Sequence, residues 1–126
     1  METILVVDDE PVVLRLCQAI LQRGGYAVLP ATSGEEALRI LHASATTIDL
    51  ALLDVIMPGM NGIELATEIE RTNQGTKVVL MSGYGPREIV RVVGVHPYRI
   101  IWKPFKTESL LQMIENALGN STGTAM

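Results

Sequence analysis

Short runs of apolar residues alternate along this chain with longer segments in which apolar residues recur at helical spacing. The runs are Ile4–Val7, Ala27–Leu29, Leu50–Leu53, Val78–Met81 and Ile100–Trp102. Continuous apolarity over so few residues is typical of parallel strands that are covered on both faces. The pattern therefore predicts five strands, each buried between layers of helix.

The segments between these runs predict five helices. Their apolar stripes lie at Val12–Leu21, Ala37–Leu41, Ile63–Ile69, within Pro86–Val93, and at Leu110–Leu118. Ser33 and Glu36 predict a capping box before the second helix, and Asn61 predicts the cap of the third. The fourth segment has the lowest helix propensity, because it is short and rich in β-branched residues. Strands that alternate with helices favour one α/β domain with a doubly wound parallel sheet.

Composition narrows the class of protein. The chain has 126 residues, 48% of them hydrophobic, a formal charge of −4, one Cys and two His. This length suits a single domain, which we expect over residues 1–119, with a flexible C-terminal tail at 120–126. The negative charge argues against binding to nucleic acid or to a membrane surface. The start METILVVDDEP lacks the pattern of a signal peptide, so we expect a cytoplasmic location.

Four of the five apolar runs are followed directly by residues that can take part in chemistry or ligand binding. They are Asp8 and Asp9 after the first, Asp54 after the third, Ser82 and Gly83 after the fourth, and Lys103 and Pro104 after the fifth. Ligands of open parallel sheets bind outside the carboxyl ends of the strands. Three of the four aspartates in the chain are thus expected at this one edge.

Three carboxylates in one pocket raise one another's pKa, and a hard divalent cation such as Mg²⁺ relieves that repulsion. Lys103 would add a fixed positive charge, Ser82 a hydroxyl group, and Gly83 room for a ligand close to the backbone. Together these groups suit the transfer of a phosphoryl group to a carboxylate.

Four segments, ILVVDDEP, LLDVIMPGMNG, LMSGYG and WKPF, resemble in order the signature segments of the receiver domain of bacterial two-component response regulators. The resemblance covers about residues 3–118, and LMSGYG is especially similar to receivers of hybrid sensor histidine kinases. It implies the CheY-like, flavodoxin-like fold: a (βα)5 arrangement with strand order 2-1-3-4-5.

The resemblance also implies a metal site and a phosphoacceptor. Asp54 would take a phosphoryl group from a phosphohistidine in a Mg²⁺-dependent reaction. Asp9 would ligate Mg²⁺ directly and Asp8 mainly through water. Asp54 would be the third ligand, and Ile56 would contribute its backbone carbonyl.

The same resemblance implies a switch. Ser82 would bond a phosphoryl oxygen after phosphorylation and shift inward with its loop, which includes Gly83. Lys103 would pair with Asp54 at rest and with the phosphate afterwards, and the Lys103–Pro104 bond would be cis.

One position departs from the family. Its members usually carry Tyr or Phe three residues before the lysine, and here that position is Ile100. The nearest aromatic residue is Trp102, which strand alternation places on the same face as Ile100. Ile100 cannot transmit the signal by the swing of an aromatic side chain. Two alternatives remain: the signal passes through shifts of the backbone and of the fourth helix, or the domain mainly passes the phosphoryl group onward.

We expect a signalling module that catalyses only its own phosphorylation and dephosphorylation. The donor would be a sensor histidine kinase or a histidine phosphotransfer protein. Output would pass to a downstream protein or to another domain of a longer parent chain, and weak homodimerisation is compatible with the family. The alternative is a degenerate or relay-only receiver that acts as a protein-interaction module. A flavodoxin is disfavoured because Asp8 and Asp9 would repel the FMN phosphate.

Overall fold

A computed structural model describes residues 1–43, 47–73 and 75–119 of the chain, so the tail expected at 120–126 lies outside the described residues. Its strands are β1 (Thr3–Val7), β2 (Ala27–Ala31), β3 (Leu50–Asp54), β4 (Lys77–Ser82) and β5 (Arg99–Trp102). Its helices are α1 (Pro11–Arg23), α2 (Gly34–Ala43), α3 (Gly62–Thr72), α4 (Pro86–Val93) and α5 (Thr107–Leu118). All strand pairs are parallel, in the order β2-β1-β3-β4-β5. The predicted α/β fold and strand order are confirmed.

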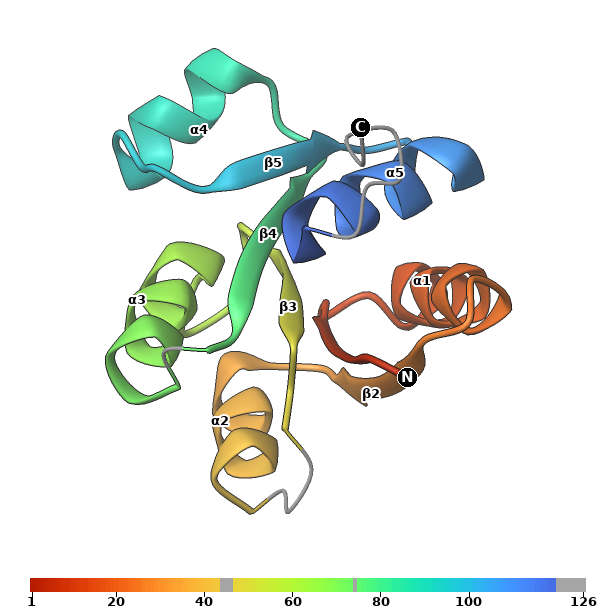
Figure 1. Ribbon diagram of the computed structural model, residues 1–126. Coiled ribbons are helices and arrows are strands. Elements are labelled where there is room, and N and C mark those ends of the chain that lie inside the picture. The colour runs from red at the N-terminus through yellow and green to blue at the C-terminus, as the bar shows by residue number, and fades with distance from the viewer. Residues whose placement is uncertain (44–46, 74, 120–126) are drawn as a thin grey trace.

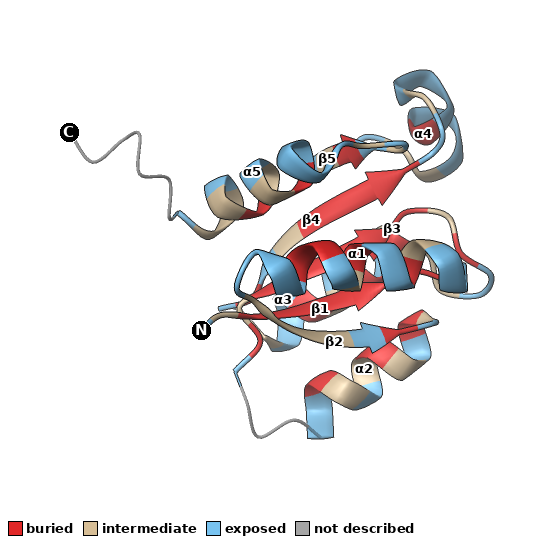
Figure 2. Cartoon of the chain, turned by 90° about the vertical axis from the view of Figure 1, so that its right-hand side faces the viewer, coloured by how far each residue is buried: buried red, intermediate tan, exposed pale blue. Residues whose placement is uncertain are grey.

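Helices cover both faces of the sheet (Figure 1): α1 and α5 lie on one side, and α2, α3 and α4 on the other. Alternate residues of each strand enter one of two apolar clusters. On β3, for example, Leu52 packs with α1 and α5, whereas Leu53 packs with α2 and α3. Every residue of β1 and β3 is buried, as the red central strands of Figure 2 show. This two-sided burial explains the continuous apolar runs in the sequence.

The strands extend beyond their apolar runs. β2 continues through Pro30 to Ala31, and β4 and β5 begin at the charged residues Lys77 and Arg99. Backbone pairing does not require an apolar side chain, and a proline without an N–H group is tolerated because β2 is an edge strand.

Caps fix the helix starts that lie near the carboxyl edge of the sheet. Asn61 and Glu64 form a capping box at the start of α3, as the sequence predicts for Asn61. Before α2, Ser33 Oγ accepts from the Glu36 N–H group at 3.1 Å, but the Glu36 carboxylate accepts from Thr32 N–H, one residue earlier than in a capping box. The same Glu36 oxygen also accepts from the Thr32 hydroxyl at 3.0 Å.

The fourth helix is the least anchored of the described helices. Ile89 is its one buried residue, and most of α4 is exposed (Figure 2). Gly85 precedes it, and Gly94 ends it with a φ of 82°, a conformation that glycine adopts without strain. No helix in the described part of the chain is long and apolar enough to cross a membrane.

Candidate functional site: an acidic cleft at the carboxyl edge of the sheet

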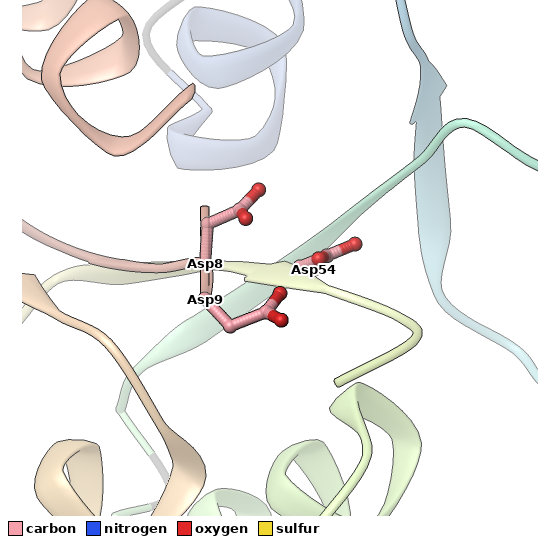
Figure 3. Close-up of side chains that lie close together, drawn as sticks. All are labelled: Asp8, Asp9 and Asp54. Atoms are coloured by element: carbon pink, nitrogen blue, oxygen red, sulfur yellow. The ribbon is translucent and has the colours of Figure 1, made fainter. Parts of the chain in front are cut away.

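Three aspartates meet where β1 and β3 end. One carboxylate oxygen from each of Asp8, Asp9 and Asp54 lies within 4.8 Å of the others. Figure 3 shows the three carboxylates facing the same space. Asp8 is completely buried, Asp54 is 5% exposed, and Asp9 is exposed. The convergence expected from the strand ends is therefore present, with one carboxylate open to solvent.

Lys103 follows β5 and lies against two of these carboxylates. Its Nζ donates a hydrogen bond to Asp8 Oδ2 at 2.9 Å and forms an ion pair with Asp54 Oδ1 at 3.4 Å. Its own N–H donates to the Ser82 carbonyl at 2.7 Å, and the Lys103–Pro104 peptide bond is cis. The lysine thus bridges Asp8 and Asp54, with the shorter contact to Asp8, whereas the resemblance implied a pair with Asp54.

The balance of burial and charge leaves Asp54 unusually basic. Burial is the largest cause that raises the pKa of Asp54 to about 7, the negative charges of Asp8 and Asp9 add to it, and Lys103 opposes it. For Lys103, burial lowers the pKa, but the hydrogen bond from Nζ to Asp8 and the charge of Asp54 outweigh it and raise the pKa above its usual value. An anionic Asp54 is therefore costly until further positive charge reaches it.

A cleft of about 560 Å³ opens over these groups. It is lined by Asp9, Glu10, Asp54, Ile56, Met57, Pro58, Gly83, Tyr84 and Lys103. Ile56 and Tyr84 line this cleft together with Asp54, and Tyr84 is 48% exposed. The start of α3 lies directly against the end of β3, and a Cβ atom at Gly62 would collide with the Asp54 carbonyl.

Ser82 ends β4 with its side chain buried, and its hydroxyl is engaged by the following loop. The Oγ atom accepts from the Tyr84 N–H group at 2.9 Å and lies 3.4 Å from the Tyr84 carbonyl, to which it donates. The pattern of residues did not predict this contact between Ser82 and Tyr84. Serine hydroxyls can bond the backbone two residues on, but the residue type alone does not indicate which serine does so.

Ile100 and Ile101 pack on opposite faces of β5, and strand alternation predicts that Trp102 shares the face of Ile100. Ile100 is partly buried and packs against the cluster under α2, α3 and α4. Trp102 is 38% exposed and pairs in register with Ser82. The aromatic residue of β5 therefore stands beside the serine at the end of the sheet.

An apolar groove adjoins the acidic cleft. Its volume is about 420 Å³, and its lining consists of Val13, Leu16, Gly83, Lys103, Pro104 and Phe105. Val12 and Leu16 belong to the predicted apolar stripe of α1, yet they are 70% and 52% exposed. The stripe is wider than the core requires, because Leu14, Cys17, Ile20 and Leu21 suffice to pack α1 on the sheet.

Comparison with known proteins decides the family. The family model of the response regulator receiver domain matches residues 4–115. The chain belongs to this family. Receiver domains are signalling domains of two-component systems, and these chain segments carry the acidic pair, the strand-end aspartate and the lysine described above.

Curated relatives and solved structures agree with the receiver assignment. The chain is 37% identical over 123 residues to the transcriptional regulatory protein CpxR of Klebsiella pneumoniae, covering 96% of this chain and 51% of CpxR. It is 33% identical over 119 residues to GlrR of Escherichia coli, covering 94% of this chain and 26% of GlrR. The chain thus spans a quarter to a half of the length of these relatives.

Among solved structures, the response regulator TrrA of Thermotoga maritima, in complex with Mg²⁺ and BeF, superposes with a TM-score of 0.81 at 32% identity, covering 93% of this chain and 99% of TrrA. A receiver domain from the hybrid histidine kinase CckA superposes with a TM-score of 0.76 at 34% identity, covering 92% and 98% of the two chains. The predicted similarity to hybrid-kinase receivers is in line with this second structure.

Proposed function

We propose that this receiver domain, over residues 1–119, accepts a phosphoryl group on Asp54 from a phosphohistidine of a sensor kinase or a histidine phosphotransfer protein. The observation that carries the proposal is the convergence of Asp8, Asp9 and Asp54 around a shared space, with Lys103 3.4 Å from Asp54. A nucleophilic carboxylate, further carboxylates for a cation and a fixed ammonium group are the parts that phosphoryl transfer needs.

The transfer consists of one bond formed and one broken. An Asp54 oxygen attacks the phosphorus atom, an O–P bond forms, and the N–P bond to the histidine imidazole breaks with its electron pair leaving on nitrogen. Lys103 lies within ion-pair distance of Asp54 and compensates the charge that spreads over the phosphoryl oxygens. Ser82 then donates its hydroxyl proton in a hydrogen bond to one of those oxygens.

The donor set fits Mg²⁺, a hard cation that prefers carboxylate, carbonyl and water oxygens. Asp9 and Asp54 would hold the ion directly, Ile56 through its carbonyl, and Asp8 through water, since both Asp8 oxygens already accept hydrogen bonds from Glu10 N–H and Lys103. When bound, Mg²⁺ supplies the positive charge that an anionic Asp54 and a phosphoryl group both require.

The apolar groove supports docking of a protein donor. A phosphohistidine has to reach Asp54 through the cleft, so the donor surface must cover the rim of the cleft. Gly83 and Lys103 line both the cleft and the groove, so Leu16 and Phe105, which line the groove, lie next to the cleft. Exposed apolar side chains beside a polar site are the usual core of a protein interface. Output to a downstream protein or a parent-chain domain, weak homodimerisation and a cytoplasmic location stay predictions.

The direct test is intact-mass spectrometry after incubation with acetyl phosphate, with and without Mg²⁺. We expect a phosphate adduct that requires Mg²⁺ and is absent from Asp54→Asn. Asp49→Asn is the matched control, because Asp49 lies at the opposite edge of the sheet and accepts a hydrogen bond from Thr3 N–H. This variant should form the adduct at the wild-type rate.

Three outcomes separate the alternatives. An adduct that persists in Asp54→Asn places the chemistry on another residue and refutes the proposal. Absence of an adduct, together with absence of Mg²⁺ binding in calorimetry, favours the degenerate receiver that serves as an interaction module. An adduct only with a phosphorylated histidine protein points to strict dependence on the partner.

A further inference from the structure

The side chain of Glu10 lines the acidic cleft, and no group in the described part of the chain bonds to its carboxylate. Glu10 is exposed and is the N-cap residue of α1, but its side chain makes no capping hydrogen bond. Its backbone is held on both sides: the N–H group donates to Asp8 Oδ1 at 2.9 Å, and the carbonyl accepts from Leu14 N–H at 3.0 Å. The residue is therefore fixed beside the cleft with a carboxylate that has no partner there.

Glu10 stands apart from the carboxylates that suit a cation. The carboxylate oxygens that lie within 4.8 Å of one another come from Asp8, Asp9 and Asp54, and Glu10 is not in this group. Mg²⁺ is usually held by one or two carboxylates and keeps several waters, so the group needs no fourth carboxylate. Glu10 thus adds a negative charge to the cleft that binding of the ion does not explain.

This charge acts on any anion that enters the cleft. Among the described residues of the lining, Asp9, Glu10 and Asp54 are acidic and Lys103 is basic, and Lys103 already pairs with Asp54. A phosphoryl group is itself anionic and has to enter the same space. For charges about 7 Å apart in water, repulsion changes a rate by about threefold per unit charge. Glu10 therefore penalises a donor in proportion to its negative charge.

We propose that Glu10 determines which donors this domain accepts, by charge. Its carboxylate repels small dianionic donors such as acyl phosphates, and it favours a phosphohistidine that has a lysine or arginine side chain beside it. This inference rests on the proposed phosphoryl acceptance by Asp54 and names the class of donor. Glu10 takes no part in bond formation and acts through its charge on the approaching donor.

Two synthetic phosphohistidine peptides test the proposal, one with lysine and one with glutamine beside the phosphohistidine. At saturating Mg²⁺ and low ionic strength, wild type should accept the phosphoryl group faster from the lysine peptide, measured by intact mass. Glu10→Gln should reduce this preference about threefold and should react with acetyl phosphate about fivefold faster than wild type. Both differences should disappear in ~0.5 M NaCl, because salt screens exposed charges.

Glu115→Gln is the matched control, because it removes the same charge from the last turn of α5, outside the lining of the cleft. It should match wild type with all three donors. An unchanged preference and an unchanged acetyl phosphate rate in Glu10→Gln would refute the role of Glu10, and phosphoryl acceptance by Asp54 would stand. Equal slowing with every donor and weaker Mg²⁺ binding in calorimetry would also refute it, since Glu10 would then support the ion. If wild type forms no adduct with any donor, the proposed function fails, and donor selection fails with it.

Discussion

The carboxyl group of Asp54 lies where burial and two neighbouring carboxylates disfavour its charge. Its pKa is raised to about 7, with burial as the first cause, and Lys103 opposes the rise only in part because its closest contact is Asp8. Asp8 thereby positions Lys103, whereas Asp9 is exposed and accessible to an ion from solvent. Of the two neighbouring aspartates, one therefore positions the lysine and the other is available to bind a cation.

Tyr84 and Ile56 should control how long a phosphoryl group stays on Asp54. Both line the cleft with Asp54, so we expect their bulk to shield the phosphorus atom from an attacking water molecule. We expect Tyr84→Ala to lose phosphate several-fold faster than wild type, measured as decay of the adduct by intact mass. Tyr84→Phe keeps the bulk and should decay at the wild-type rate. Equal decay of Tyr84→Ala and wild type would remove Tyr84 from this role.

The residues of the site could be predicted because each follows a buried strand, and topology alone then brings them to one edge. Asp8, Asp54, Ser82 and Lys103 are of this kind. The partners of the side chains could not be predicted in the same way. Whether Lys103 meets Asp8 or Asp54, and whether Ser82 binds Tyr84, depends on rotamers and loop conformation, which a pattern of residue types does not specify.

At the scale of elements, the strands and helices follow from periodicity, but the width of an apolar stripe does not reveal what covers it. Val12 and Leu16 match the helical spacing of the α1 core and yet are exposed, and Leu16 lines the groove next to the cleft. Pro30 in β2 shows the converse, since a residue that usually interrupts strands is accepted at an edge. Packing and edge position, both non-local, decide these cases.

The exposed apolar residue Leu16 of α1 should affect phosphotransfer from a protein donor and leave phosphotransfer from a small-molecule donor unchanged. Leu16→Asp places a charge on the apolar rim, so we expect phosphotransfer from a phosphorylated histidine phosphotransfer domain to slow by about tenfold or more. The rate with acetyl phosphate should be unchanged, because Leu16 lines the groove and not the cleft. Val92→Asp on α4, at a valine that is 60% exposed, is the control. Equal slowing by both variants would argue against α1 as the docking surface.

At the scale of the whole molecule, the buried Asp54 makes the free energy of unfolding depend on pH. The pKa of Asp54 is about 7 in the fold against an ordinary value of 3.8, so between these limits the folded chain binds more protons than the unfolded chain. Stability from this group is therefore fully present below about pH 4 and is lost as the pH rises through 7. The fold thus carries its functional carboxylate at the expense of stability near neutral pH.

Asp54→Asn should remove that cost. Without Mg²⁺ at pH 8, we expect its free energy of unfolding to exceed that of wild type by about 1–3 kcal/mol, and the difference should shrink toward pH 5. Saturating Mg²⁺ at pH 8 should stabilise wild type by about 2–3 kcal/mol at a hundredfold excess over its dissociation constant, and the variant by much less. Urea unfolding at several pH values, with Asp49→Asn as the control, measures both effects.

If wild type were the more stable protein at pH 8 without Mg²⁺, the carboxylates would not repel one another as the geometry requires. Stabilisation of the Asp54→Asn variant by Mg²⁺ to the same extent as wild type would place the ion away from Asp54.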